Sequence, residues 1–216
     1  VIFQAALGAW TVTMLLKPAI VTSHLLGGIT ILALLVTILF RVGGTAGWCA
    51  PIAPIPPLKW MGMIAIVVLA CQIILGGWVS TNYAALACQD LPTCHGQWIP
   101  SMDFANAFHI IRPLGVGPDG ELLTIEALRA IHWVHRLGAL VALLVVGWFA
   151  ILLMRQPTGR AAGKMLMAAL ALQIVLGVSN ILFSLPLPVA VAHNGVAAVL
   201  FVLLLLINLR MSKHGN

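Results

Sequence analysis

Long apolar runs occupy most of this chain. No charged residue lies between Arg136 and Arg155, and that interval contains the run VALLVVGWFAILLM. A helix needs about 20 apolar residues to cross the hydrocarbon core of a bilayer. Six segments of this kind occur, at roughly 1–16, 19–40, 61–83, 127–154, 164–184 and 189–209. We therefore predict six transmembrane helices.

The composition agrees with a membrane protein. Hydrophobic residues make up 62% of the chain, charged residues make up 7%, and the mean hydropathy is +1.09. These values lie far outside the range of soluble proteins. No segment shows the short alternation of apolar and polar residues that marks a transmembrane β-barrel strand. The predicted fold class is an all-α, polytopic helical bundle in a lipid bilayer.

Basic and acidic residues are separated along the chain. Most of the eleven lysines and arginines lie in connections on one side of the predicted helices, namely Arg41, Lys59, Arg155, Arg160, Lys164, Arg210 and Lys213. The positive-inside rule predicts that this side is cytoplasmic. All five acids lie between the third and fourth predicted helices, at Asp90, Asp103, Asp119, Glu121 and Glu126. The net charge of +6 thus reflects membrane topology and not a surface for nucleic acid.

An internal repeat relates the predicted hairpins. The first hairpin superposes on the last without a gap, with Gln4 on Gln173, Gly8 on Gly177 and His24 on His193. The third predicted helix carries the same opening, Gln72 and Gly76, and the helix that returns from it bears His135. Each hairpin thus has a histidine on its returning helix, at His24, His135 and His193.

The three repeated histidines are predicted to share one layer of the membrane. His24, His135 and His193 each lie roughly four to eight residues past the outer boundary, or about 6 to 12 Å deep. Neutral imidazole is a good iron ligand, and facing helices of a bundle can hold a haem between two such ligands. A single histidine could instead hydrogen-bond to a neighbouring helix. Zinc is a weaker alternative, because no cysteine or carboxylate is expected in this layer.

Arg136 and His132 lie beside His135 at the start of the same apolar run. An arginine within a membrane helix costs about 2.5 to 3.5 kcal/mol, so Arg136 is expected to have an anionic partner. A haem propionate would suit it, and an arginine that extends to the lipid headgroups is the alternative. His132 lies one turn before His135, where it could contact a propionate, relay protons or simply lie at the interface.

Cys88 and Cys94 lie on the predicted outer side, where a disulfide is permitted, and we predict that they pair. Cys71 and Cys49 are interpreted as small packing residues. The outer loop from 95 to 126 carries His95, His109 and Arg112 among prolines, glycines and acids. We interpret that loop as a solvated cap, and we assign no chemistry to these three side chains.

Four stretches of the chain together resemble the haem A synthase family in its proteobacterial and mitochondrial-like form. They are LGGWVSTNYAALACQDLPTCHGQW, IHWVHRLGAL, VTSHLLGG and LPLPVAVAHNGVA. The family has eight helices in two pseudo-symmetric halves of four, and this chain is similar to helices three to eight, so we expect it to lack the first two. The resemblance implies that 1–60 is the second hairpin of the N-terminal half and that 61–216 is the C-terminal half, with an outer loop at 84–126.

The resemblance also implies roles for individual residues. His135 and His193 match the axial ligands of haem b in the C-terminal half. His24 matches one of two histidines in the N-terminal half, where haem O is oxidised. The other histidine and a glutamate would belong to the absent hairpin, so no catalytic residue is assigned. His132 occupies the position equivalent to that glutamate.

The family converts the C8 methyl group of haem O to the formyl group of haem A, which serves the terminal oxidase. The resemblance therefore implies an oxidoreductase with haem b as cofactor, and with haem O synthase and cytochrome oxidase assembly factors as partners. It also implies that the chain lies in the bacterial inner membrane. Cys88 and Cys94 match the family's loop cysteines and are expected on the periplasmic side. The C-terminus is expected in the cytoplasm. The alternative is a membrane cytochrome b that only carries electrons. A transporter ranks last, because the repeated hairpins share one orientation.

Overall fold

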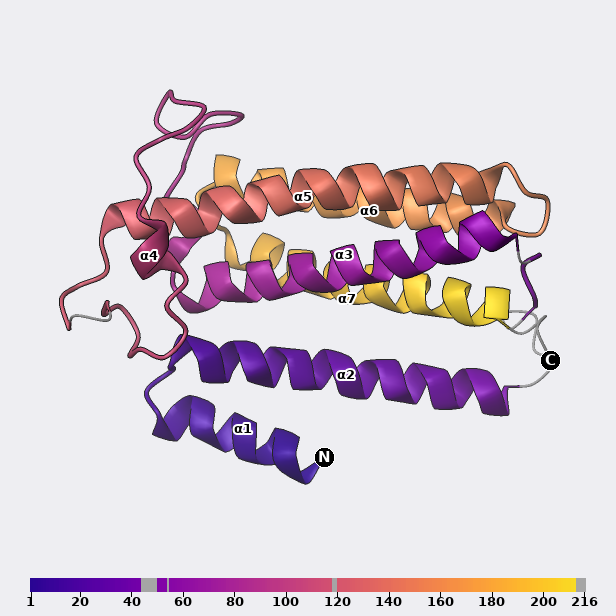
Figure 1. The fold of residues 1–216 in the computed structure, drawn as a ribbon, viewed down its shortest axis with the longest axis horizontal. Helices are drawn as coiled ribbons and strands as arrows, with labels where there is room; N and C mark the ends of the chain where they lie inside the picture. The colour runs from indigo at the N-terminus through magenta and orange to yellow at the C-terminus, as the bar shows by residue number, and fades with distance from the viewer. Residues whose placement is uncertain (44–49, 54, 118–119, 213–216) are drawn as a thin grey trace.

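The computed structural model describes residues 1–43, 50–53, 55–117 and 120–212, and it is helical (Figure 1). Five helices are long and apolar enough to cross a membrane: α2 (Pro18–Val42), α3 (Pro56–Thr81), α5 (Ile125–Met154), α6 (Arg160–Leu182) and α7 (Leu187–Ser212). The first predicted segment forms α1 (Ile2–Thr13), an apolar helix of 12 residues that ends at the turn before α2. The chain is thus a polytopic helical membrane protein, as predicted, with five spanning helices in the described ranges.

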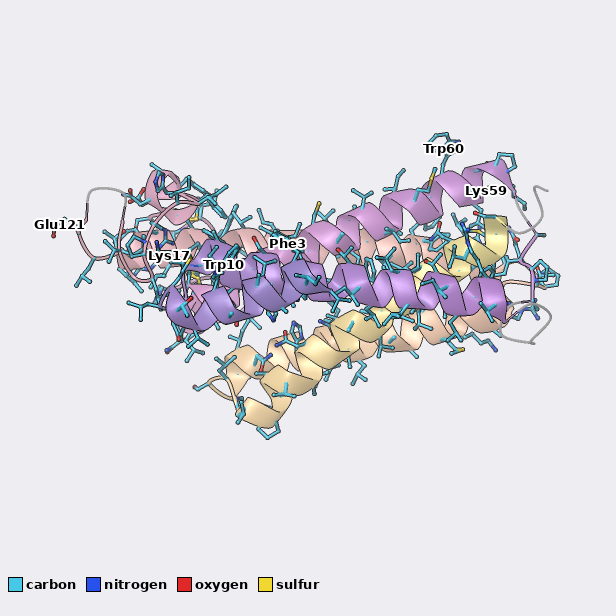
Figure 2. All side chains as sticks on the ribbon, turned by 90° about the horizontal axis from the view of Figure 1, so that it is seen from below. Phe3, Trp10, Lys17, Lys59, Trp60 and Glu121 are labelled. Carbon is cyan, nitrogen blue, oxygen red and sulfur yellow. A yellow bond between two sulfur atoms is a disulfide. The ribbon has the colours of Figure 1, made fainter. Side chains whose placement is uncertain are left out.

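Helices α3, α5, α6 and α7 form a four-helix bundle. Helix α3 packs against α5 and α7, and α6 packs against the same two helices, so α5 and α7 lie diagonally across the bundle. Helix α2 packs against α3 and α7 at one edge, and α1 packs on α2 (Figure 1). The long connection with η2 (Ala84–Leu86) and α4 (Phe104–Ala107) covers one end of the bundle, where α7 diverges from α3 (Figure 2).

Two clusters of buried apolar residues lie along the bundle. The larger cluster fills the half that is remote from the long connection and includes Leu69, Phe149, Leu166 and Leu204. The smaller cluster joins the other end of the bundle to the long connection and includes Trp78, Ala107 and Ile131. The stretch of bundle between the two clusters carries mostly half-buried side chains. This interval contains the repeated histidines.

The backbone repeats itself at the turn of each hairpin. Five residues near these turns have positive φ: Leu15 (52°), Leu16 (57°), Tyr83 (53°), Ser184 (55°) and Leu185 (63°). The left-handed conformation costs an L-residue roughly 1–2 kcal/mol, so it recurs only where the surrounding structure requires it. The repeat in the sequence is therefore also a repeat in conformation, which is interrupted in the middle hairpin by the long connection.

The interpretation of the outer loop as a solvated cap is wrong for Arg112. This side chain is only 3% exposed. Its guanidinium donates hydrogen bonds to Oδ1 of Asn82 and to the carbonyls of His109 and Val116, and it lies 5.8 Å from the centre of the Trp78 ring. A buried guanidinium is stable when its donors are paired in this way. The loop is therefore an ordered cap that is anchored to the end of α3.

Candidate functional site: a layer of histidines and glutamines

Each of the three repeated histidines lies against a glycine of the preceding helix. A Cβ atom added to that glycine would lie close to the histidine Cε1: 3.0 Å for Gly8 and His24, 3.2 Å for Gly76 and His135, and 3.1 Å for Gly177 and His193. Carbon atoms in ordinary contact are about 3.5–4.0 Å apart. A larger residue at any of these glycines would therefore displace the imidazole, which explains why the glycine recurs with the histidine in the repeat.

A glutamine holds the histidine in the first two hairpins. Nε2 of Gln4 donates a hydrogen bond to the backbone carbonyl of His24 at 2.7 Å. Nε2 of Gln72 donates to the carbonyl of His135 at 3.1 Å and also lies 3.1 Å from Nδ1 of the same ring. A second glycine makes room for each amide, since a Cβ on Gly27 would collide with Oε1 of Gln4. Gly138 does the same for Gln72.

The third hairpin differs in this contact. Nε2 of Gln173 lies 3.2 Å from Nε2 of His193, and the described contacts show no bond to the His193 carbonyl. Val196 stands where the other two units carry Gly27 and Gly138. Without that glycine the amide has less room beside the backbone, and it reaches the ring instead.

The structure places two of the three histidines on helices of the four-helix bundle. His135 lies on α5 and His193 lies on the diagonal helix α7. His24 lies on α2 at the edge of the bundle. It lies at the level of the end of α3, because the hydroxyls of Thr22 and Thr81 are 3.4 Å apart.

Several buried polar atoms of this layer have no partner among the described residues. They are Oε1 of Gln4, Gln72 and Gln173, and Nδ1 of His24 and His193. An unpaired buried polar atom costs roughly 1–3 kcal/mol, so such atoms rarely collect in one place without a reason. The layer therefore has the polarity expected of a binding site.

A surface pocket among the described residues lies elsewhere. It is lined by Lys59, Trp60 and Asn208 among others, near the start of α3 and the end of α7. The histidines lie toward the opposite ends of these helices. We therefore define the candidate site by the contacts of the histidine layer and not by that pocket.

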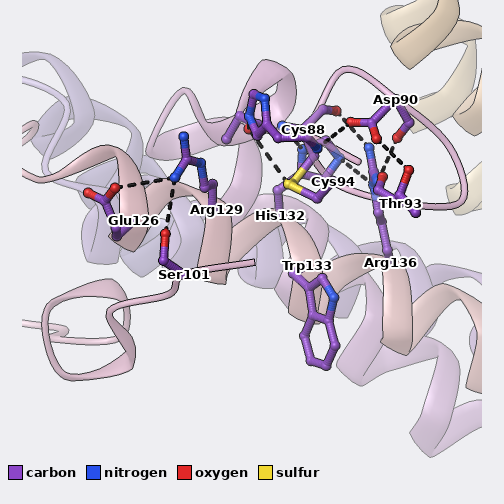
Figure 3. The surroundings of a disulfide bond; sticks show 12 residues. Cys88, Asp90, Thr93, Cys94, Ser101, Glu126, Arg129, His132, Trp133 and Arg136 are labelled. Carbon is purple, nitrogen blue, oxygen red and sulfur yellow. Dashed lines mark hydrogen bonds and ion pairs between the residues drawn. A yellow bond between two sulfur atoms is a disulfide. The ribbon is translucent and has the colours of Figure 1, made fainter. Parts of the chain in front are cut away.

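Arg136 has partners that the sequence did not predict. Its guanidinium donates to three carbonyls of one loop, those of Cys88 (2.6 Å), Asp90 (2.9 Å) and Thr93 (2.8 Å) (Figure 3). Its Nε donates to Nε2 of His132 at 3.3 Å. The arginine is thus held by backbone oxygens of the loop above the membrane helix. A contact with a haem propionate stays a prediction.

His132 is buried, with an exposed fraction of 4%, and it lies under the same loop. The backbone N–H of Cys88 lies 3.4 Å from its Nδ1, while Arg136 donates to its Nε2. A neutral imidazole accepts a hydrogen bond at only one nitrogen. His132 can therefore accept from one of these two donors at a time, and its tautomer decides which.

The predicted disulfide between Cys88 and Cys94 is present, with an S–S distance of 2.00 Å. Within the small loop that it closes, the carboxylate of Asp90 accepts hydrogen bonds from the Thr93 hydroxyl at 2.5 Å and from the backbone N–H of His95 at 2.6 Å. The N–H of Gly96 donates at 2.9 Å. These bonds, that of Thr93 first, hold the pKa of Asp90 well below its ordinary value of 3.8.

Cys71 does not belong to the site. Cys71 is exposed on α3 and is free, so it does not pack in the bundle interior as predicted. Cys49 lies outside the described residues. His109 is exposed as well, whereas Nε2 of His95 lies 3.0 Å from the carbonyl of Ala87 and helps to close the disulfide loop.

The disulfide should protect Cys88 and Cys94 from thiol alkylation. In the unreduced protein, peptides carrying these cysteines should remain unlabelled, and both should become labelled after reduction. Peptide mass spectrometry separates them from the free Cys71. The variant Cys88→Ser, which releases the Cys94 thiol, is the positive control. Immediate labelling of both cysteines in the wild-type protein would contradict the pairing.

Asp90 should make the loop resistant to acid. A carboxyl group with a lowered pKa stabilises the folded state above its ordinary pKa and loses that contribution as the pH falls through the folded value. A phosphine should reduce the disulfide of Asp90→Asn faster than that of the wild type, and the ratio of the two rates at each pH cancels the titration of the phosphine. That ratio should stay constant from pH 7 to about 4 and fall toward 1 only in stronger acid, whereas Asp103→Asn should match the wild type at every pH. Equal profiles for Asp90→Asn and the wild type would contradict this role.

The fold and the site define a class: polytopic helical membrane proteins with paired histidines on diagonal helices beneath a disulfide-closed loop. Residues 1–205 match the cytochrome oxidase assembly protein family, COX15-CtaA, and the chain belongs to that family. The predicted resemblance is thereby confirmed.

Individual relatives carry the name haem A synthase. The chain is 40% identical over 210 residues to that of Shewanella oneidensis, which covers 96% of the chain and 63% of the relative. It is 29% identical over 217 residues to that of Halalkalibacterium halodurans, covering 99% and 66%, and 33% identical over 138 residues to that of Paracoccus denitrificans, covering 62% and 33%. The chain thus spans less than two thirds of the length of these relatives.

Proposed function

We propose that this chain carries the haem-binding histidines of a haem A synthase. This oxidoreductase oxidises the C8 methyl group of haem O to the formyl group of haem A for assembly of the terminal oxidase. Membership of the cytochrome oxidase assembly protein family and the name of the relatives support the proposal. The observation that carries it is the pair of half-buried imidazoles on the diagonal helices α5 and α7, each held against a glycine.

His135 and His193 would hold a haem b. They fit such a group because they lie on diagonal helices of the bundle, beyond the larger apolar cluster on each helix. The unpaired buried Nδ1 of His193 also fits, since metal-bound imidazoles take up hydrogen bonds at the free nitrogen. When bound, haem supplies one-electron redox chemistry. Arg136 and His132, next to His135 in space, would face its propionates or move protons.

His24 would belong to a separate haem site, the one that takes haem O. Its contacts with Gly8 and Gln4 repeat those of His135, while its helix α2 lies outside the four-helix bundle. Residues 1–60 would then be the second hairpin of an N-terminal half, and residues 61–216 the C-terminal half with its loop at 84–126. No catalytic residue is assigned.

The charges support one orientation in the bacterial inner membrane. Basic residues such as Lys59 and Lys164 lie at the end of the bundle opposite the long connection, and the acids lie in or beside that connection. By the positive-inside rule the disulfide loop is periplasmic and the end of α7 is cytoplasmic. Haem O synthase and cytochrome oxidase assembly factors are the protein partners that this function requires.

Extraction of the bound haem tests the proposal. Haem extracted from the full-length protein in detergent is identified by mass, and a reduced-minus-oxidised spectrum is recorded alongside. We expect haem b together with haem O or haem A. His24→Ala should keep the b signal and lose retention of haem O or A. Haem b alone in the wild-type protein would favour an electron-carrying cytochrome b, and no haem at all would overturn the histidine assignment.

A further inference from the structure

The three glutamines of the repeat share an unusual property. In Gln4, Gln72 and Gln173 the side-chain oxygen Oε1 is buried and has no partner among the residues described, although the amide nitrogen of each has one. A carbonyl oxygen is a hydrogen-bond acceptor. Each hairpin therefore keeps an unused acceptor within the layer of its histidine.

Iron binding creates a donor in the same place. A neutral imidazole that binds a metal through Nε2 carries its proton on Nδ1, and that N–H is almost always bonded to an acceptor. For His135, the described side chain within hydrogen-bond distance of Nδ1 is Gln72, at 3.1 Å. The acceptor that the bound state needs is therefore on the residue that already faces the ring.

The amide of Gln72 points its nitrogen toward Nδ1 in the structure. A donor at that position fixes the imidazole proton on Nε2, and this tautomer does not bind iron through Nε2. The oxygen and nitrogen of an amide exchange places by rotation about its terminal bond, which here gives up the bond from Nε2 to the His135 carbonyl in exchange for the bond from Nδ1 to Oε1. Gly138 leaves space beside the amide, because a Cβ there would collide with Oε1 of Gln72.

We propose that Gln72 is a positioning residue for His135, whose Oε1 accepts the Nδ1 proton when Nε2 binds iron. The proposal is confined to this pair, because the amide of Gln173 faces Nε2 of His193 and that of Gln4 bonds to the His24 backbone carbonyl. The proposal rests on the proposed haem function, and it adds a hydrogen bond that governs how strongly the imidazole donates electrons to the iron.

The alternative is a purely structural role, in which the glutamine hydrogen bonds only stabilise the packing of the two helices of each hairpin. The two roles differ in what they change. Loss of a purely structural hydrogen bond lowers the stability of the fold and leaves the reduction potential and the spectrum of the haem iron unaltered. Loss of an acceptor at Nδ1 makes the imidazole a weaker base, which raises the reduction potential of the haem.

The test measures the midpoint potential and the low-spin electron paramagnetic resonance spectrum of haem b in the full-length detergent-purified protein. In Gln72→Leu, which removes the acceptor, we expect a more positive potential and about 10-fold weaker haem retention. In Gln72→Glu, which keeps an acceptor oxygen, the potential should lie at or below that of the wild type. Gln156→Leu is the control, because its Oε1 is also buried without a described partner but lies in the turn between α5 and α6.

Two results would overturn the proposal. One is a wild-type potential and spectrum in Gln72→Leu, and the other is a shift of Gln72→Glu in the positive direction. Should Gln72→Leu retain no haem, the sign of the shift in Gln72→Glu decides alone. Failure of the underlying haem function is a separate outcome, because it would appear as missing haem b in the wild-type protein.

Discussion

Alanine at His135 or at His193 is expected to abolish the low-spin haem b signal. Each replacement removes one of the two proposed axial ligands, and the nearby buried His132 already faces Arg136 and the N–H of Cys88. A small apolar side chain cannot replace the lost nitrogen at the iron. The reduced-minus-oxidised spectrum of each purified variant measures the effect.

The matched control is His109→Ala, since His109 is exposed in the outer cap and far along the chain from the layer. Its spectrum should equal that of the wild type. An unchanged low-spin signal in His135→Ala or in His193→Ala would show that the paired histidines are not the ligands. Loss of the signal in His24→Ala would show instead that the histidines are paired differently.

Leucine at Arg136 is expected to release the disulfide loop from the bundle. The substitution removes the donors to the carbonyls of Cys88, Asp90 and Thr93 and the bond to His132. Hydrogen bonds to a charged group contribute roughly 1.5–3 kcal/mol each and are not additive, so we expect a loss of about 3 kcal/mol or more in local stability. Hydrogen exchange of the loop amides, read by mass spectrometry, measures that loss.

Two variants give this experiment its controls. Arg136→Lys keeps the charge but lacks the planar fork that reaches several carbonyls at once, so it should fall between Leu and the wild type. Arg129→Leu removes an arginine two turns earlier, whose partner Glu126 lies 3.2 Å away in a partly exposed ion pair. Such a pair contributes at most about 1 kcal/mol. Equal exchange in Arg129→Leu and Arg136→Leu would contradict the anchoring role.

The sequence predicted those parts of the molecule that follow from periodicity and charge. Apolar runs between basic residues located the spanning helices, and the repeated histidines located the polar layer, because helical rise converts spacing into depth. The disulfide followed from two cysteines on one side of the membrane. The first predicted segment, 1–16, includes the hairpin turn at Leu15 and Leu16, because an apolar stretch does not reveal where such a turn begins.

The contacts that depend on the path of a loop could not be predicted. Arg136 suggested an anionic partner, yet backbone carbonyls supply its hydrogen bonds, and these come together only when the disulfide loop folds over α5. Arg112 lay in a polar stretch that gave no sign of burial. The sequence did show that Gln72 and Gly76 belong to the repeat, but it gave Gln72 no role. That role follows only from the position of its amide beside the imidazole of His135.

The contacts between glutamine and histidine also set an order in which the parts of the layer can form. Gln4 and His24 are separated by 20 residues, as are Gln173 and His193, so each pair can meet as soon as two neighbouring helices lie side by side. Gln72 and His135 are 63 residues apart. The entropy cost of closing a chain segment grows with the logarithm of its length, so this middle contact is the slowest to form. The contact between Gln72 and His135 therefore depends on the folding of the long connection outside the membrane helices. Conditions that delay closure of the Cys88–Cys94 loop would then delay formation of this contact.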